Sequence, residues 1–285
     1  AQFALARLAG GPLPGGAAEL SWRAAGLRGA SDVLRTAGEA FDEAALAADA
    51  QRAAEAARAA LPGPPGDSRI DALTLVWPLD LLDRLGPAAP ALEQALAWVS
   101  EARLLDGGVH RASPPCGLSC LDTAVLGHAE LALRRPSALD RLDWLLSRAR
   151  PEGVWPSAFD PRTGWGSGGH GHDPAVGAAF LLLVARLHAL DDAAGLDVCP
   201  LLSPAQRGVD WAVHELSTRW GVLSYALRWH GPRPALLWEL TPPAAPGPSF
   251  ALRAGALDPS FAARELAGEA LLAAPPEGPA GASFG

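Results

Sequence analysis

The stretch that decides the expected fold is residues 137–187, SALDRLDWLLSRARPEGVWPSAFDPRTGWGSGGHGHDPAVGAAFLLLVARL. Both of its ends are apolar at intervals of three and four residues, which predicts two helices. Ser137 and Asp140 have the spacing of a capping box at the first helix. Asp173 precedes a proline, as the residue before a helix often does, so we expect it to cap the second. The Gly-, Pro- and Trp-rich residues 150–173 between them read as a long loop, which in a compact domain is usually functional.

Further helical segments lie upstream, at residues 21–38, 42–61, 70–83, 89–102 and 119–133. Short links alternate with longer loops that hold the polar and aromatic residues. Successive helices joined in this way predict antiparallel pairs, arranged as an α/α hairpin array or toroid with its functional loops at one end.

The hydrophobic period changes after Pro200. Residues 222–229 and 235–240 alternate between apolar and other side chains, and a turn sequence at 230–234 separates them. Residues 250–253 and 269–272 could add strands. We therefore expect three parts: a helical domain at 1–200, a small all-β module at 205–275 and a loose tail at 276–285.

Composition excludes several classes of protein. The 285 residues carry a net charge of −8, and their 23 basic residues are all arginines scattered along the chain, so a nucleic-acid partner is not expected. The longest uncharged apolar run, 175–185, is too short to span a membrane, and no signal peptide opens the chain. Three cysteines favour free thiols over a bridge between Cys116 and Cys120, which predicts a cytoplasmic protein.

The chemistry-bearing residues gather in four loops or helix starts. They are Glu19 and Trp22; Arg69 and Asp71; His110 and Arg111, with Asp122 nearby; and, in the long loop, Trp155, Asp160, Trp165, His170 and His172. Charged side chains and imidazoles can hydrogen-bond sugar hydroxyls, while Trp rings offer apolar platforms. A Trp at helical spacing, such as Trp98 or Trp144, is more often a core residue, whereas the two loop tryptophans favour a ligand platform.

Two of these groups have simpler explanations. Arg69 and Asp71 could equally form an ion pair at a helix start. His170 and His172 stand two residues apart without clear further ligands, and Asp173 is explained by its capping role, so we expect no metal site. No motif for a cofactor is present, and none is expected.

Several strings of the sequence resemble the six-hairpin glycosidases of bacteria, closest to glucoamylase-like proteins related to glycoside hydrolase family 15. The most specific strings are GGHGHDPA at 168–175 and RWHGPRPALLWEL at 228–240, and the resemblance covers most of residues 20–272. It implies a mainly α fold: an (α/α)6 toroid followed by a small β module. About seven helical segments against the twelve of six hairpins imply a partial toroid. Together with the absence of Met, this predicts the C-terminal part of a longer protein.

The resemblance also implies hydrolysis of glycosidic bonds by a carboxylic acid and a carboxylate. It makes Glu19 and Asp160 the catalytic candidates, although Ser157 stands where many relatives have a Glu. The residues that would line the sugar subsites are Trp22, Arg69, Asp71, His110, Arg111, Trp155, His170 and His172. Two hypotheses remain: a glycoside hydrolase acting on an oligosaccharide, or a protein with degenerated carboxylates that binds a glycan or serves a structural role. The oligomeric state is not predicted.

Overall fold

The computed structural model describes residues 85–112, 116–192, 194–242 and 250–275. Contacts divide the chain into a first unit, Ala1–Leu183, and a second unit, Val184–Gly285. The four described helices are α6 (Leu85–Ala102), α7 (Cys120–Ala132), α8 (Ser137–Arg148) and α9 (Pro174–His188), and the division falls inside α9. No described helix is long and apolar enough to cross a membrane.

Helix α7 lies at the centre of the first unit and is buried along nearly its whole length. Its N-cap, Ser119, accepts a hydrogen bond from the backbone N–H of Asp122 at 3.2 Å. His128 lies within hydrogen-bonding distance, 3.0 Å, of the carbonyl oxygen of Ala179 on α9. A helix that is apolar on most of its faces fits this central position.

Helix α6 follows the predicted spacing. Leu96 and Val99 of α6 pack in one buried cluster with Val125 and Leu126 of α7. Helix α8 begins at Ser137, but its N-cap is Pro136 and no side chain caps it, so the predicted capping box is wrong.

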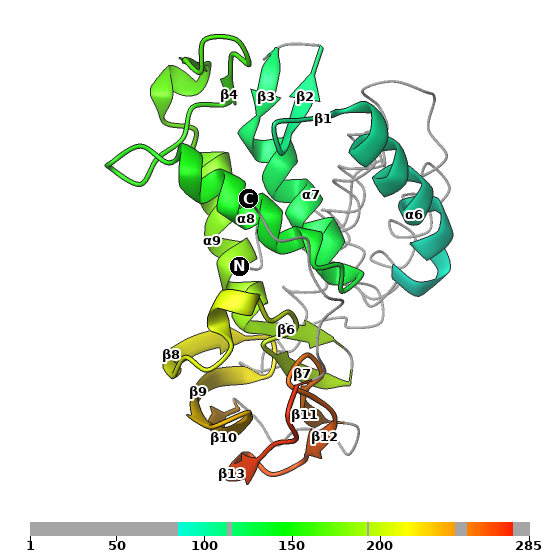
Figure 1. Ribbon diagram of the computed structural model, residues 1–285, viewed down its shortest axis with the longest axis vertical. Helices are drawn as coiled ribbons and strands as arrows, with labels where there is room; N and C mark the ends of the chain where they lie inside the picture. Colours follow the sequence, from blue (N-terminus) through cyan, green and yellow to red (C-terminus); the bar gives the residue numbers. More distant parts are fainter. Residues whose placement is uncertain (1–84, 113–115, 193, 243–249, 276–285) are drawn as a thin grey trace, which may run out of the picture. The chain divides into compact units, whose positions relative to one another are not determined.

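A five-stranded antiparallel sheet has the order β1-β2-β3-β4-β5, and Figure 1 shows β2, β3 and β4 at the upper ends of these helices. Its strands are β1 (Leu104–Leu105), β2 (Gly108–Arg111), β3 (Gly117–Ser119), β4 (Ala158–Phe159) and β5 (Gly166–Ser167). Strand β3 leads directly into α7, and the short η1 helix (Gly169–Gly171) follows β5. The sheet therefore joins the start of α7 to the loop that follows α8.

The second unit consists of two four-stranded sheets, β13-β10-β9-β8 and β12-β11-β7-β6. Its strands are β6 (Ala189–Asp192), β7 (Gly195–Val198), β8 (Trp211–Thr218), β9 (Gly221–His230), β10 (Arg233–Thr241), β11 (Ala251–Ala254), β12 (Asp258–Ala263) and β13 (Ala267–Leu271), and η2 (Pro204–Gln206) precedes β8. All pairs are antiparallel except β7 with β11.

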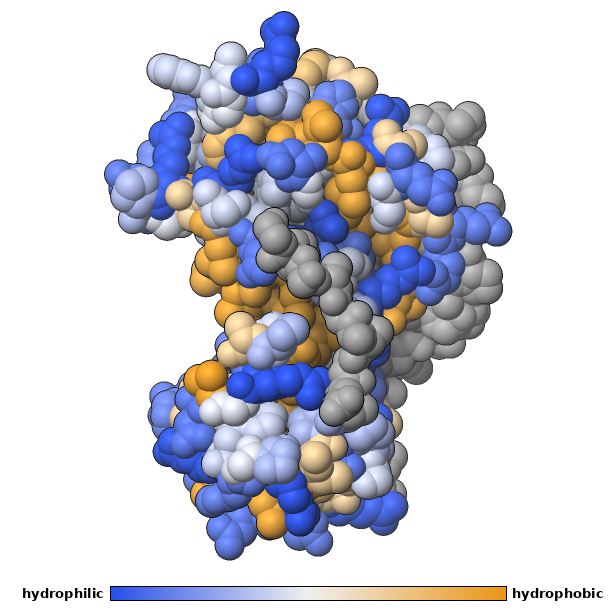
Figure 2. Space-filling model, in the orientation of Figure 1, coloured by the Kyte–Doolittle hydropathy of each residue, from blue (hydrophilic) through white to orange (hydrophobic). Residues whose placement is uncertain are grey.

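The core of the second unit takes residues from both sheets, and the visible face of this unit is mostly hydrophilic (Figure 2). Leu223, Tyr225 and Leu227 of β9 are buried, as the period-2 pattern predicted, and so are Leu236 and Trp238 of β10. In the register, Tyr225 is opposite Trp238 and Leu227 is opposite Leu236. The predicted β-hairpin with its turn near residue 231 is confirmed.

The predicted fold class, a mainly α partial (α/α)6 toroid with a small β module, is wrong. The described residues hold more strand than helix, in four helices and three antiparallel or mixed sheets. Strands β1 to β5 lie between the helices, where only loops were expected, because backbone pairing needs no hydrophobic period in strands of two to four residues. The expected helices at 21–38, 42–61 and 70–83 and the tail at 276–285 lie outside the described residues.

Candidate functional site

The loop between α8 and α9 is held by backbone hydrogen bonds along its length. Arg150 closes a tight turn, accepting from Gly153 N–H at 2.8 Å and donating to the carbonyl oxygen of Val154 at 3.0 Å. Asp160 N–H donates to the carbonyl oxygen of Trp165 at 2.9 Å. The expected structureless loop is therefore a folded segment that contains β4, β5 and η1.

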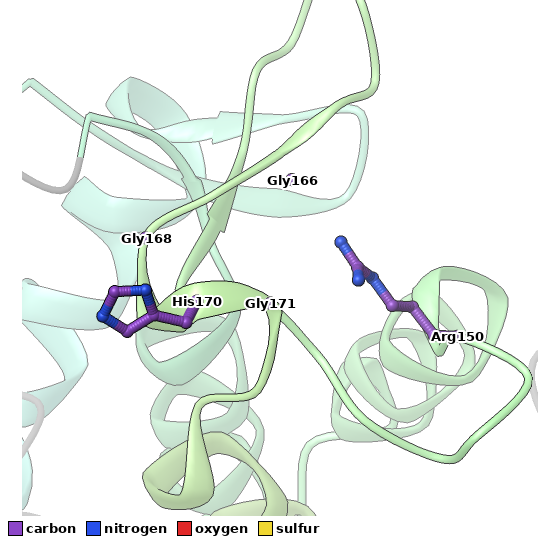
Figure 3. A pocket seen from close by; sticks show the side chains of 5 residues that line it. All are labelled: Arg150, Gly166, Gly168, His170 and Gly171. Carbon is purple, nitrogen blue, oxygen red and sulfur yellow. The ribbon is translucent and has the colours of Figure 1, made fainter.

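A pocket of about 490 Å³ opens on this segment. Its lining residues are Arg150, Gly166, Gly168, His170 and Gly171. Figure 3 shows the Arg150 side chain reaching from the end of α8 toward the glycine-rich segment, while the His170 ring is turned to the other side. Arg150 therefore supplies the charge of this pocket, and the glycines supply much of its wall.

Glycines make room for the Arg150 guanidinium. A Cβ atom at position 171 would lie 2.8 Å from Nη1 and 3.3 Å from Cζ of Arg150. A Cβ atom at position 166 would lie 2.7 Å from Cγ of Pro156 and 3.4 Å from Nη2 of Arg150. These distances show that the guanidinium packs against bare backbone on two sides.

The structure leaves the Arg150 charge unbalanced. Within the described residues its guanidinium forms no hydrogen bond or ion pair. The nearby acid Asp173 is already engaged at both oxygens: Oδ2 accepts from the Ser157 hydroxyl at 2.7 Å, and Oδ1 accepts from Ala175 N–H at 3.0 Å as the helix cap predicted from the sequence. An exposed cation without a partner can bind an anionic group.

Asp160, one of the two catalytic candidates, is a half-buried residue that organises its own turn. Its Oδ1 accepts hydrogen bonds from the backbone N–H groups of Thr163 at 3.0 Å and Arg162 at 2.8 Å. These bonds, that from Thr163 first, hold the pKa of the carboxyl below its usual value. A general acid needs a raised pKa, so this carboxyl is unsuited to protonate a leaving group.

The candidates His110 and Arg111 lie on β2 and do not line the pocket. Arg111 makes a bidentate ion pair with Asp122, with Nε to Oδ2 at 2.7 Å and Nη2 to Oδ1 at 3.1 Å. His110 is half-buried, and its backbone N–H donates to the carbonyl oxygen of Arg103. The Arg111 guanidinium thus joins β2 to the first turn of α7.

The two loop tryptophans have opposite environments. Trp155 is 4% exposed, its Nε1 donates to the carbonyl oxygen of Leu145 at 2.8 Å, and its ring lies 4.7 Å from that of Phe180. Trp165 is 79% exposed. Only the second offers its ring face to a ligand in this structure.

The other candidates divide between the pocket, the surface and the undescribed residues. His170 lines the pocket, and His172 is exposed on the following residues. Glu19, Trp22, Arg69 and Asp71 lie outside the described residues. Arg150 is the charged side chain that lines the pocket. It was not among the residues expected from the sequence, because a single arginine after a helix matches no motif. The glycines at 164, 166, 168, 169 and 171 were the available signal.

In the described part of the chain, the side chains favour neither metal binding nor catalysis by a buried thiol. There, no group of three or more His, Cys, Asp or Glu side chains could hold a metal ion. All three cysteines are free, and burial raises the pKa of Cys120 and Cys199 to about 12. Such thiols are protonated at neutral pH and are poor nucleophiles.

Comparison with known proteins adds no assignment. No family model, no curated protein and no solved structure gives a significant match to this chain. The function must therefore be argued from the site.

Proposed function

We propose that this chain is a glycan-binding protein without glycosidase activity, and that its binding segment is the loop of residues 150–173. The observation that carries the proposal is Trp165, whose indole is 79% exposed and directly precedes the pocket residue Gly166. It is the most exposed large hydrophobic side chain of the described residues. An indole face of this kind packs well on the C–H face of a sugar ring.

The polar side of a sugar also finds a partner in this segment. The Arg150 guanidinium offers N–H donors to hydroxyl or carboxylate oxygens, and the pocket beside it has a volume within the range of about 300–1,000 Å³ typical of small-ligand sites. An apolar platform and a polar donor in one loop supply the two kinds of contact that a saccharide needs.

The lowered pKa of Asp160 and the serine at position 157 favour glycan binding over hydrolysis. Glycosidases place an acid and a second carboxylate about 5–9.5 Å apart on either side of the scissile bond. Asp160 has a lowered pKa and is committed to its own turn, and Ser157 donates its hydroxyl to Asp173. A serine hydroxyl cannot replace a carboxylate in this chemistry.

A glycan array followed by calorimetry tests the proposal. We expect the natural chain to bind at least one oligosaccharide, and Trp165→Ala to weaken that binding about ten-fold or more through loss of the platform. Leu105→Ala is the matched control, because Leu105 is also an exposed apolar residue of the first unit but lies on β1. Absence of binding to any glycan, or equal losses in the two variants, would contradict the proposal.

A further inference from the structure

We infer that the pocket at Arg150 receives a carboxylate, so that the glycans bound are acidic, of the uronic-acid class. This inference rests on the proposed glycan-binding function and adds the identity of the recognised group. It starts from the contrast between Arg150 and other arginines of the same unit. Arginines that each face a carboxylate are Arg111 with Asp122, Arg135 with Glu93, Arg141 with Glu130 and Arg148 with Asp106.

The Arg150 guanidinium lies beside close backbone and, within the described residues, faces no counter-charge. Its backbone is fixed by the turn to Val154, and its planar group packs beside Gly166 and Gly171, where Cβ atoms would collide with it or with Pro156. The planar guanidinium loses little freedom for each hydrogen bond when it forms paired bonds. The pocket therefore offers an exposed guanidinium beside close backbone to a ligand.

The backbone of the pocket wall has several positive φ angles. Gly168, His170 and Gly171 all have positive φ, of 72°, 48° and 83°. Glycine adopts this region readily, but a histidine there is strained. Strained residues persist where the surrounding structure imposes them, and they gather at ligand-binding sites.

The Arg150 guanidinium favours a carboxylate as the group bound in the pocket. A guanidinium presents two parallel N–H donors, which match the two oxygens of a carboxylate. A neutral hexose offers a single hydroxymethyl oxygen where a uronic acid offers that carboxylate. A saccharide chain that carries a carboxylate can balance the charge of Arg150, and another sugar ring of the same chain can stack on the exposed Trp165 of this loop.

The test compares uronic-acid oligosaccharides with their carboxyl-reduced counterparts, which differ only by a hydroxymethyl group in place of each carboxylate. We expect the natural chain to bind the acidic form about ten- to a hundred-fold more tightly. Arg150→Gln is expected to remove that preference, by lowering the affinity for the acidic form to about that for the reduced form. The matched control is Arg162→Gln, an exposed arginine of the same loop that does not line the pocket, and it should keep the preference.

A second variant displaces the guanidinium without removing its charge. Gly171→Ala places a Cβ atom against the guanidinium and should weaken the preference, with folding checked by circular dichroism. Equal affinity for the acidic and reduced forms, or a preference that survives Arg150→Gln, would overturn the inference while the proposed function stands. Absence of binding to both forms and to every neutral glycan would overturn both.

Discussion

Ser157 stands where the proposed absence of glycosidase activity can be tested on a single side chain. Its hydroxyl donates to Oδ2 of Asp173 at 2.7 Å, and Asp173 in turn caps α9. A glutamate at position 157 would bring a second carboxylate against Asp173. Like charges at this distance disfavour ionisation of both groups and weaken the cap.

We predict that Ser157→Glu lowers the free energy of unfolding by about 1–3 kcal/mol near neutral pH and confers no turnover of aryl glycosides. Urea unfolding and a chromogenic glycoside assay measure the two effects. Ser157→Ala, which only removes the hydrogen bond, should cost about 0.5–1.5 kcal/mol. Glycoside hydrolysis by Ser157→Glu would show that the loop is built for catalysis.

Arg111 provides a second prediction, because it was expected to bind sugar and instead joins β2 to α7. The pair is only partly exposed, at 17% for the Arg111 side chain and 7% for Asp122. Arg111→Lys keeps the charge but loses the paired geometry, so we expect a loss of about 1–2 kcal/mol in stability and unchanged glycan affinity. Arg162→Lys, on an exposed turn, should change neither. A weakened affinity in folded Arg111→Lys would return this residue to the binding site.

At the scale of elements, the end of α9 holds a pH-sensitive contact. His188 Nδ1 lies 3.3 Å from the Tyr225 hydroxyl of β9, and that hydroxyl donates to the His188 carbonyl oxygen at 3.2 Å. Burial lowers the pKa of His188 below its usual value of about 6.5. The folded second unit therefore favours the neutral imidazole.

The sign of the resulting pH dependence follows from that lowered pKa. The unfolded chain takes up the proton first as pH falls, so the stabilisation is complete above about pH 6.5 and is lost from there down to the lowered folded pKa. We predict that stability of the second unit falls between pH 7 and pH 5 and that His188→Gln flattens this slope. Urea titrations at several pH values measure it, and an equal slope in both proteins would refute the assignment.

The elements also show what the sequence could and could not reveal. Helices α7, α8 and α9 and strands β9 and β10 were predictable, because each is long enough to display its period. Strands β1 to β5 are two to four residues long and include Gly108, Gly117 and Gly166, so neither period nor β-propensity marks them. Their pairing depends on residues that are distant in sequence.

The candidate site was predictable to a similar degree. The density of Gly and Trp pointed to the loop in which the pocket opens, but not to which of its side chains are exposed. Trp155 and Trp165 have the same local character, and only tertiary packing against Phe180 buries the first and leaves the second exposed. Arg150 gains its role from backbone that approaches it closely at Gly171, a relation that no local pattern records.

At the scale of the molecule, the second unit has a hydrophobic core of its own. The cluster runs from Ala189 to Leu272, and it takes residues from both sheets of this unit. A domain with a self-contained core can fold without the rest of its chain. This property distinguishes the β-sheet unit from the loop that carries the proposed site.

We therefore predict that residues 184–275 expressed alone form a folded β domain. Far-ultraviolet circular dichroism should show β structure, and the near-ultraviolet signal should show immobilised tryptophans. Leu227→Asp, which buries a charge in the core, should abolish both signals. A disordered spectrum for the natural fragment would show that its stability depends on the preceding residues. The same fragment should bind no glycan, since it lacks residues 150–173.

Binding of a glycan by the loop of residues 150–173 can be measured directly. The indole N–H resonances of the ten tryptophans can be followed by NMR in ¹⁵N-labelled protein during titration with a uronic-acid oligosaccharide, with Trp165 assigned through Trp165→Phe. The account predicts that the Trp165 resonance shifts and saturates while that of buried Trp155 stays in place. A titration in which the Trp165 resonance does not move, whatever the others do, would contradict it.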